Sequence, residues 1–381
     1  MASHVEAFPV PLGPGVLDLV EPLRRALDGE GPALLPVPAG QPVPPGAAGP
    51  LRDWESAAAL VVATSGSTGA PRGVLLSAAA LRASATATHE RLGGPGRWLL
   101  ALPATHVAGV QVVVRSLLAG VAPGVLDLTP GFRPSAFAVA AAPVLESPGR
   151  HYTALVPTQL ARLLAGEGPG LAALRRFDAV LLGGAAAPPA LLGRAADAGV
   201  RVVTTYGMSE TAGGCVYDGV PLDGVRVRLA DERIELAGPV LALGHRGGEP
   251  IGDWFRTGDL GMTLPDGRLE VVGRADDVIV TGGEKVPPAL VERVLVEQPG
   301  VLEACVVGVP DDEWGQVVAA VVVPVDRAAL PAGEALREAV RVAAGRASAP
   351  KLLRFVPELP LRGPGKVDRT AVASLFRSPT G

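Results

Sequence analysis

Residues 58–92 read AALVVATSGSTGAPRGVLLSAAALRASATATHERL, in which signs of a strand, a small polar loop and a helix follow one another directly. The apolar run at 58–64 is typical of a buried strand, and the Ala-rich stretch at 77–92 is typical of a helix. Further apolar runs, separated by helical stretches, follow at 152–157, 177–184 and 200–207. Strands that are apolar along their whole length predict an α/β fold with a largely parallel sheet covered on both faces.

The pattern of the chain changes after residue 214. Short strands separated by Asp-Gly or Asp-Glu pairs follow there and predict an antiparallel hairpin region. From Ala275 onward the pattern is a self-contained α+β one. We therefore expect a large N-terminal domain, residues 1–274, of mostly parallel sheets with flanking helices and a small β region, and a small mobile α+β domain, residues 275–381. The uncharged Pro/Gly-rich stretch at 31–51 is expected to be a surface connector.

Composition and charge exclude several function classes. The 34 basic and 38 acidic residues are nearly balanced, so no nucleic-acid partner is expected. Cys215 and Cys305 lie far apart without a CxxC pair, which supports neither a disulfide framework nor a zinc finger. The N-terminus carries Glu6 and prolines where a signal peptide needs a basic start and an apolar run, and the apolar stretch at 98–114 contains polar residues. We expect a cytoplasmic protein with no membrane partner.

The loop at 64–73, TSGSTGAPRG, is the first candidate site. Its hydroxyls and glycines allow backbone amides and side chains to turn inward around an anion, which predicts a phosphate cradle. The alternative is an ordinary Gly/Ser turn after a strand. The Walker pattern GxxxxGK[ST] is absent, so this is not a P-loop.

Two further motifs come later in the chain. Thr257-Gly258-Asp259 offers a carboxylate that can hold the two hydroxyls of a ribose, or it is simply a turn. The run GRADD at 273–277 lies where the two domains meet, so Arg274 could reach a ribose or phosphate, and the Asp276-Asp277 pair with nearby glycines could absorb backbone rotation as a hinge. An interdomain salt bridge is the alternative for this segment.

Lys366 is the most unusual cation of the sequence. Of the 34 basic residues, 31 are arginine, and the lysines are Lys285, Lys351 and Lys366. Lys366 stands in PLRGPGKVDR at 360–369, a Gly/Pro-rich segment before a terminal helix. A compact ammonium there suits a role in neutralising negative charge as it develops, whereas a solvated loop lysine is the alternative.

Together these motifs resemble those of the ANL superfamily of adenylate-forming enzymes, over about residues 58–369. The likeness includes YGMSET at 206–211 and GGAAAP at 183–188. It implies a two-step reaction in which a carboxylate attacks the α-phosphate of ATP, giving an acyl-adenylate and pyrophosphate, and the thiol of CoA then displaces AMP. Arg72 and Ser209 depart from the family's usual lysine and threonine but keep a positive charge and a hydroxyl.

The resemblance also implies residue roles. Lys366 would stabilise the reacting phosphate, Glu210 would bind Mg²⁺, Asp276 would be the hinge, and Gly282 and Gly283 would face CoA. The ATP and AMP site would be formed by Thr64, Ser65, Gly66, Ser67, Thr68, Gly69, Arg72, Gly183, Gly184, Ala185, Tyr206, Gly207, Ser209, Asp259 and Arg274.

Within that superfamily the chain is most similar to the o-succinylbenzoate:CoA ligases of menaquinone biosynthesis, through LPATHVAGVQ at 102–111 and the run at 206–225. The likeness implies that His106 gates the acyl pocket; a core histidine is the alternative. Arg115 is a candidate for the second carboxylate of this substrate, or a surface cation, and Thr211 is a further acyl-site candidate. His4, His89, His151 and His245 show no ligand spacing and receive no role.

Other functions stay open on the sequence alone. The same chemistry could act on another aryl or acyl acid, or a free-standing adenylation enzyme could load a carrier protein. A nucleotide-binding relic without catalysis is a third reading, against which Lys366, Asp259 and Glu210 argue. The expected partners are an aryl carboxylic acid, ATP and CoA, and assembly into a homo-oligomer is compatible with the sequence.

Overall fold

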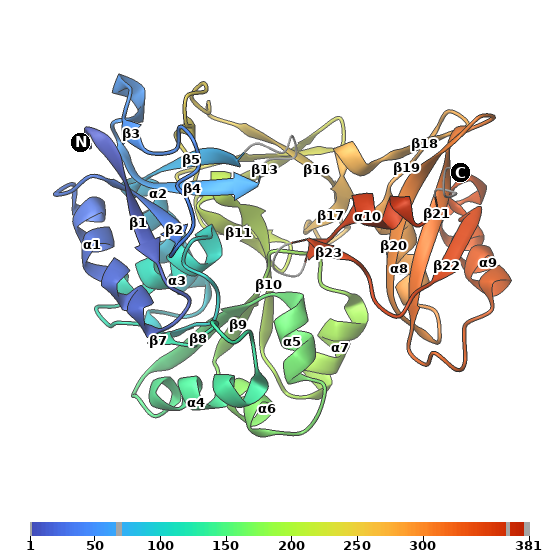
Figure 1. Ribbon diagram of the computed structural model, residues 1–381, viewed down its shortest axis with the longest axis horizontal. Coiled ribbons are helices and arrows are strands. Elements are labelled where there is room, and N and C mark those ends of the chain that lie inside the picture. Colours follow the sequence, from blue (N-terminus) through green and yellow to red (C-terminus); the bar gives the residue numbers. More distant parts are fainter. Residues whose placement is uncertain (1, 66–70, 363–365, 377–381) are drawn as a thin grey trace. The chain divides into compact units, whose positions relative to one another are not determined.

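The computed structural model describes residues 2–65, 71–362 and 366–376, without the side chains of residues 65, 71, 362 and 366 (Figure 1). It confirms the α/β fold class. The chain forms two compact units: Met1–Ala187, Leu192–Arg228 and Glu235–Arg256 make the first, and Pro188–Leu191, Leu229–Ile234 and Thr257–Gly381 make the second. The predicted domain boundary at 274/275 stays a prediction.

The first sheet of the first unit has six strands of mixed direction. Their spatial order is β15 (Gly244–His245), β5 (Pro71–Ser77), β4 (Ala58–Ser65), β2 (Ala33–Pro38), β1 (His4–Val10) and β3 (Gly49–Pro50). Strands β1, β2 and β4 run parallel, whereas β4 and β5 form an antiparallel pair around the TSGSTGAPRG motif.

Strand β2 corrects the expectation of a surface connector at 31–51. Residues 33–37 are buried, and the strand lies between β1 and β4 inside the sheet. Pro36 and Pro38 are two residues apart, so their nitrogens, which carry no hydrogen, face the same edge of the strand. They are tolerated because the pairing of β2 with β4 is limited to Leu34 and Leu60. The prediction made from composition alone was therefore wrong for this stretch, which contains a buried strand.

The second sheet of this unit has seven strands and is largely parallel. Their spatial order is β12 (Val220–Pro221), β11 (Gly213–Tyr217), β10 (Val202–Met208), β9 (Ala179–Leu182), β8 (Arg150–Leu155), β6 (Gly96–Leu100) and β7 (Gly124–Val125). Strands β10 to β7 run parallel, and β11 and β12 are antiparallel additions at one edge. All four residues of β9 are buried, as expected of a strand covered on both faces.

Helices cover both faces of this second sheet. Helix α3 contacts β6, β8 and α2, while α4 contacts β6 and β7 (Figure 1). Ser77 caps α2 by accepting a hydrogen bond from the amide of Ala80. The helices of this part of the chain are α1 (Val20–Asp28), α2 (Ala78–Arg91), α3 (Val107–Leu118), α4 (Pro134–Leu145), α5 (Pro157–Leu163), α6 (Pro169–Leu174) and α7 (Pro189–Asp197).

A four-stranded sheet follows in the region where hairpins are expected. Its spatial order is β13 (Arg226–Ala230), β14 (Arg233–Ala237), β16 (Phe255–Thr263) and β17 (Leu269–Arg274). Strands β16 and β17 are antiparallel. Thr257, Gly258 and Asp259 lie inside β16, so the interpretation of this motif as a simple turn is wrong.

The last part of the chain is the α+β body that the sequence predicts. Its main sheet has the order β19 (Glu284–Val286), β18 (Ile279–Thr281), β21 (Gly315–Pro324) and β20 (Val301–Asp311), with β22 (Leu352–Phe355) also paired to β21. The remaining elements are α8 (Pro288–Val296), α9 (Gly333–Ala344), β23 (Leu361–Arg362), β24 (Lys366–Val367) and α10 (Arg369–Ser374).

Alternation along β20 and β21 builds a core on each face of this sheet. Val306 and Val318 pack in one cluster with residues of α8 and α9, whereas Val307 and Val317 pack in another with Val372 of α10. Neighbouring strand residues point to opposite faces, so two helical layers bury the two sides. Among the described residues, no helix combines the length and apolar character needed to cross a membrane.

Candidate active site

A cavity of about 110 Å³ lies at the carboxyl ends of β8, β9 and β10 in the first unit. Strand ends supply much of its lining, and α3 and β11 supply the rest. Parallel strands present their carboxyl ends at one edge, which is where ligands bind in such sheets. The lining residues are Leu102, Val107, Ala108, Gln111, Arg115, Ala154, Leu155, Val156, Leu181, Gly183, Gly184, Thr205, Gly207, Gly213, Gly214 and Tyr217.

Arg115 of α3 is a buried cation in the wall of this cavity, with only 3% of its surface exposed. Its Nη2 lies 3.5 Å from Tyr217 Oη, and its Cζ lies 5.0 Å from the ring centre of Trp98. Its Nε is buried and has no hydrogen-bond partner among the described residues, and burial lowers the pKa of the guanidinium. Within the described part of the chain, no carboxylate pairs with Arg115. The alternative of a surface cation is therefore wrong for this residue.

Gln111 is one turn earlier on the same face of α3 and is fully buried. Its Nε2 donates to the carbonyl of Ala212 at 2.8 Å, while its Oε1 has no partner among the described residues. The cavity wall thus carries an unpaired donor at Arg115 and an unpaired acceptor at Gln111. A buried polar atom without a partner is costly, so both favour a polar ligand or water.

His106 occupies the N-cap position of α3. Its side chain is exposed, and the next two residues, Val107 and Ala108, line the cavity. The alternative of a histidine enclosed in the core is wrong. The position beside the cavity is compatible with a gate, which stays a prediction.

The segment after β9 supplies backbone next to the cavity. Gly183 and Gly184 both line it, and Gly184 has φ +82°, which favours glycine. A Cβ at Gly183 would lie 2.4 Å from Thr205 Oγ1, so a side chain is excluded there. Gly184 and Ala185 are exposed, and small residues leave room for a flat group to approach the backbone.

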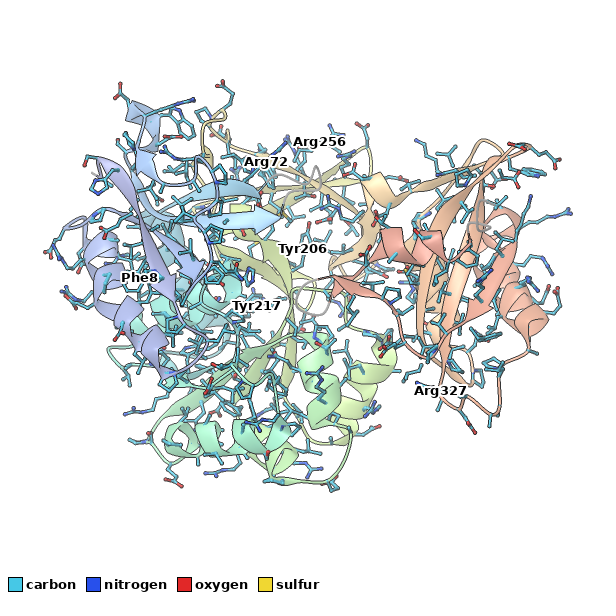
Figure 2. The ribbon with its side chains drawn as sticks, viewed as in Figure 1. Phe8, Arg72, Tyr206, Tyr217, Arg256 and Arg327 are labelled. Carbon is cyan, nitrogen blue, oxygen red and sulfur yellow. The ribbon has the colours of Figure 1, made fainter. Side chains whose placement is uncertain are left out.

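Strand β10 carries the next predicted residues, Tyr206 and Gly207. Figure 2 labels Tyr206 and also Tyr217, which belongs to the neighbouring strand β11; Tyr206 pairs with Val216 in the register of the two strands. Tyr206 is half-buried, and Gly207 lines the cavity. Tyr217 is not a residue that the sequence singled out.

A 3₁₀ turn, Ser209–Thr211, follows β10 directly. Ser209 is buried, and Thr211 is fully buried with its hydroxyl donating to the carbonyl of Gly213 at 2.8 Å. Glu210 lies between them, and its Oε1 is 2.9 Å from Nε2 of His245. One carboxylate with substrate phosphates is a common ligand set for Mg²⁺, so Glu210 fits a magnesium bound together with a nucleotide.

The TSGSTGAPRG motif is only partly described. Thr64 and Arg72 are paired across β4 and β5, and Thr64 Oγ1 donates to the carbonyl of Arg72 at 3.1 Å. The Arg72 side chain is exposed. Gly66, Ser67, Thr68 and Gly69 lie outside the described residues, as does the side chain of Ser65, so their predicted contacts with phosphate stay predictions.

Asp259 and Arg274 are brought together in the second unit by β16 and β17. They are register partners, and Arg274 Nη1 lies 3.3 Å from Asp259 Oδ1. Arg274 Nη2 also lies 3.4 Å from Oδ2 of Asp276. A Cβ on Gly258 would lie 2.6 Å from the guanidinium, so glycine makes room for this arginine. The geometry gathers one cation and two carboxylates.

The other predicted residues of the second unit are placed by two hairpins. Gly282 and Gly283 form the turn between β18 and β19, beside Trp314. The backbone of Lys366 belongs to β24, which pairs with β23, whereas its side chain lies outside the described part. Asp368 caps α10 by accepting a hydrogen bond from the amide of Ala371 at 3.0 Å.

Two family models match this chain. The model described as AMP-binding enzyme matches residues 38–243, and the model described as AMP-binding enzyme C-terminal domain matches residues 290–366. The chain belongs to the AMP-binding enzyme family. The predicted resemblance to adenylate-forming enzymes is confirmed.

Individual relatives in this family are similar over most of the chain. A protein of Mycobacterium tuberculosis named "Probable 2-succinylbenzoate--CoA ligase" is 47% identical over 380 residues, which are 98% of this chain and 98% of that protein. A feruloyl-CoA synthase of Amycolatopsis is 33% identical over 352 residues, 83% of this chain and 70% of that one. The solved o-succinylbenzoate CoA synthetase of Bacillus subtilis, in complex with the acyl-adenylate OSB-AMP, has a TM-score of 0.70 and 27% identity, covering 83% of this chain and 69% of that chain.

Sequence reasoning missed three residues of this AMP-binding enzyme's candidate site. Gln111 could have been found, because it is four residues before Arg115 and shares its helix face. Tyr217 and His245 carry no such signal, because tertiary packing brings them beside Arg115 of helix α3 and Glu210 of the 3₁₀ turn.

Proposed function

We propose that this chain is an AMP-forming ligase that converts o-succinylbenzoate and CoA to o-succinylbenzoyl-CoA, a step that the resemblance places in menaquinone biosynthesis. The carboxylate attacks the α-phosphorus of ATP and releases pyrophosphate, and the CoA thiolate then attacks the acyl carbon and releases AMP. The names of the M. tuberculosis and B. subtilis relatives support this substrate.

Arg115 is the observation that carries the substrate assignment. A buried guanidinium without a carboxylate partner loses hydration and gains little in return, unless an anion enters the cavity. o-Succinylbenzoate has two carboxylates, of which one reacts, so the second can pair with Arg115. Gln111 and Tyr217 would hold this end of the substrate beside the arginine.

The nucleotide would bind beside the backbone of Gly183 and Gly184, which also line the acyl cavity. Residues 183–185 and Tyr206 would hold the adenine between backbone and ring, and Asp259 would accept hydrogen bonds from the ribose hydroxyls. Arg274 is already paired with Asp259 and would add a positive charge near the ribose. The loop at 64–69 and Arg72 would hold the β- and γ-phosphates, while Glu210 would bind the Mg²⁺ that bridges phosphate oxygens.

The second unit would supply the residues that change between the two half-reactions. Lys366 would stabilise charge on the phosphate during adenylation, and rotation about Asp276 would then withdraw it. Gly282 and Gly283 would face CoA in the second half-reaction. His106, exposed at the N-cap of α3, would gate the passage between CoA and the acyl cavity.

A second substrate class is favoured by one comparison, the feruloyl-CoA synthase of Amycolatopsis. Ferulate has a single carboxylate, so it would leave Arg115 without an anion. The two readings therefore differ in whether the substrate must be a dianion. Carrier-protein loading and nucleotide binding without catalysis remain alternatives that a product assay separates.

The purified chain with ATP, Mg²⁺, CoA and o-succinylbenzoate tests the proposal. We expect o-succinylbenzoyl-CoA, AMP and pyrophosphate in equal amounts, measured by mass spectrometry and a pyrophosphate assay. Formation of ADP and phosphate would contradict the adenylate route. Absence of a thioester both with o-succinylbenzoate and with ferulate, with nucleotide still bound, would favour the non-catalytic reading instead.

A further inference from the structure

His245 is a histidine without a role in the sequence motifs, and the fold places it against Glu210. Its Nε2 lies 2.9 Å from Glu210 Oε1, and the two side chains are 29% and 16% exposed. The residues are separated by 35 positions and come from different elements, β15 and the turn after β10. The contact is therefore a product of tertiary structure.

The backbone around His245 is held on two sides. His245 pairs with Val74 of β5, the strand that follows the TSGSTGAPRG loop. The amide of Ala242 donates to the carbonyl of Glu210 at 2.8 Å, and the amide of Arg246 donates to the carbonyl of Gly73 at 2.7 Å. The imidazole thus projects from a segment that is bonded both to Glu210 and to the strand leaving the phosphate loop.

A neighbouring ion pair makes this segment more rigid. Arg246 Nη1 pairs with Glu55, whose side chain is completely buried, and the amide of Gly247 donates to Glu55 Oε1 at 3.0 Å. Because the residues on both sides of His245 are bonded to their neighbours, the ring reaches Glu210 from a backbone position that is held in place.

We infer that His245 is a positioning residue for Glu210. An ionised carboxylate only accepts hydrogen bonds, so a Glu210 that binds a metal takes the N–H of the Nε2 tautomer of His245 as the hydrogen-bond donor to Oε1. This bond restricts the carboxylate to one orientation and does not use its second oxygen, Oε2. The inference rests on the proposed function, in which Glu210 binds the Mg²⁺ that accompanies ATP.

The orientation of Glu210 matters because the described residues offer no cluster of acidic, histidine or cysteine side chains that could hold the metal without it. In the described ranges, no group of three or more His, Cys, Asp or Glu side chains could hold a metal ion. Magnesium in such a site depends on one carboxylate and on substrate phosphates, with strict octahedral geometry. A partner that orients a metal ligand commonly contributes 10- to 100-fold to metal affinity.

The main competing explanation is that His245 hinders metal binding by Glu210. In that case His245 would occupy the carboxylate in the absence of nucleotide and would have to be displaced by the metal. Removing the imidazole would then strengthen metal binding. The sign of the change in metal affinity therefore separates positioning from competition.

Electron paramagnetic resonance of Mn²⁺ provides the test, with α,β-methylene-ATP as a nucleotide that cannot be adenylated. The full-length variants are His245→Ala, His245→Gln, Glu210→Gln and the control His151→Ala. His151 also lies near a carboxylate, with Nδ1 3.8 Å from Asp178 Oδ2, but it is at the amino end of β8, away from the cavity. Thermal melting of each variant establishes that it is folded.

We expect His245→Ala to weaken Mn²⁺ binding in the nucleotide complex about tenfold. His245→Gln, which keeps a donor, should recover most of that affinity, and His151→Ala should match the wild type. Unchanged or tighter binding in His245→Ala, or a glutamine variant as weak as the alanine one, would overturn the inference. Failure of the wild type to bind Mn²⁺ with the nucleotide, or full affinity in Glu210→Gln, would instead contradict the proposed function.

Discussion

Arg369 and Glu292 form a two-pronged ion pair that ties the start of α10 to α8. Nη1 of Arg369 lies 2.8 Å from Glu292 Oε1, and Nη2 lies 3.1 Å from Oε2. Nη1 also donates to the carbonyl of Val306 at 2.6 Å, and Nε lies 3.3 Å from Asp277 Oδ2. One side chain, three residues after Lys366, thus joins a helix, a strand and the segment next to the predicted hinge.

Glu292→Gln should destabilise the second unit, because it removes the charge that compensates a partly buried guanidinium. We expect a loss of about 1–3 kcal/mol in the free energy of unfolding, between the values for exposed and buried pairs. Glu338→Gln, in the exposed pair with Arg341 on α9, is the matched control and should change stability by less than about 1 kcal/mol. Urea unfolding measures both. Equal effects would show that the Arg369 pair is no more than a surface contact.

Lys366→Ala should separate the two half-reactions. In the proposed mechanism the ammonium stabilises negative charge at the α-phosphate, so we expect acid-dependent pyrophosphate release to fall about 10²- to 10³-fold. Thioester formation from a supplied acyl-adenylate should be nearly unchanged, because the proposed second half-reaction does not use this lysine. Lys351→Ala is the control for pyrophosphate release. An equal loss in both half-reactions would contradict the two-conformation mechanism.

Arg115→Met should abolish the preference for a diacid. Methionine keeps apolar contact with Trp98 but offers no charge to a second carboxylate. The comparison uses o-succinylbenzoate and its two monoacids, 4-oxo-4-phenylbutanoate and 2-butanoylbenzoate. We expect the ratio of kcat/KM between the diacid and the reactive monoacid to fall about 100-fold, which corresponds to roughly 3 kcal/mol. A ratio that stays constant would show that Arg115 does not contact the substrate.

Because His89 is buried, the free energy of unfolding should decrease in mild acid. The imidazole is buried and accepts a hydrogen bond from Trp98 Nε1 at 3.3 Å, and burial, with a smaller effect of Arg115, lowers its pKa to about 4. Between pH 6.5 and pH 4 the unfolded chain binds a proton that the folded chain does not, so stability falls as pH falls. His89 should lower the free energy of unfolding by about 2 kcal/mol at pH 5 relative to pH 7.

The matched variant for that pH effect is His89→Gln, which keeps an acceptor for Trp98 but does not titrate. Urea unfolding followed by tryptophan fluorescence at pH 7 and pH 5 gives the comparison. The variant should lose about 2 kcal/mol less than the wild type over this interval. Parallel losses in the two proteins would show that His89 does not titrate as described.

The strand and helix order was predictable because long apolar runs leave few alternatives. Strand β9 and helix α2 lie where hydrophobic patterning and a Ser77 cap place them. Strand β2 was not predictable, because proline and glycine content is read as a break, whereas pairing with β1 overrides it. Local composition does not reveal which neighbours a strand will find.

The candidate site shows the same limit. Motifs led to Arg115 and Glu210 because their residue types and spacing resemble those of known enzymes. They did not lead to the burial of Arg115, which depends on Trp98 and Tyr217 from other elements, or to the contact of Glu210 with His245. Partners separated by 35 or 102 positions are brought together by the packing of helices, turns and sheets, which a single sequence does not display.

The most direct test of the account is a panel of acids supplied to the purified protein with ATP, Mg²⁺ and CoA. o-Succinylbenzoate, benzoate, ferulate and a medium-chain fatty acid would be compared by kcat/KM, with each CoA thioester measured by mass. We expect o-succinylbenzoate to be turned over far better than the monoacids, because of these four acids it alone supplies a second carboxylate for Arg115. Faster turnover of benzoate, ferulate or the fatty acid would contradict it.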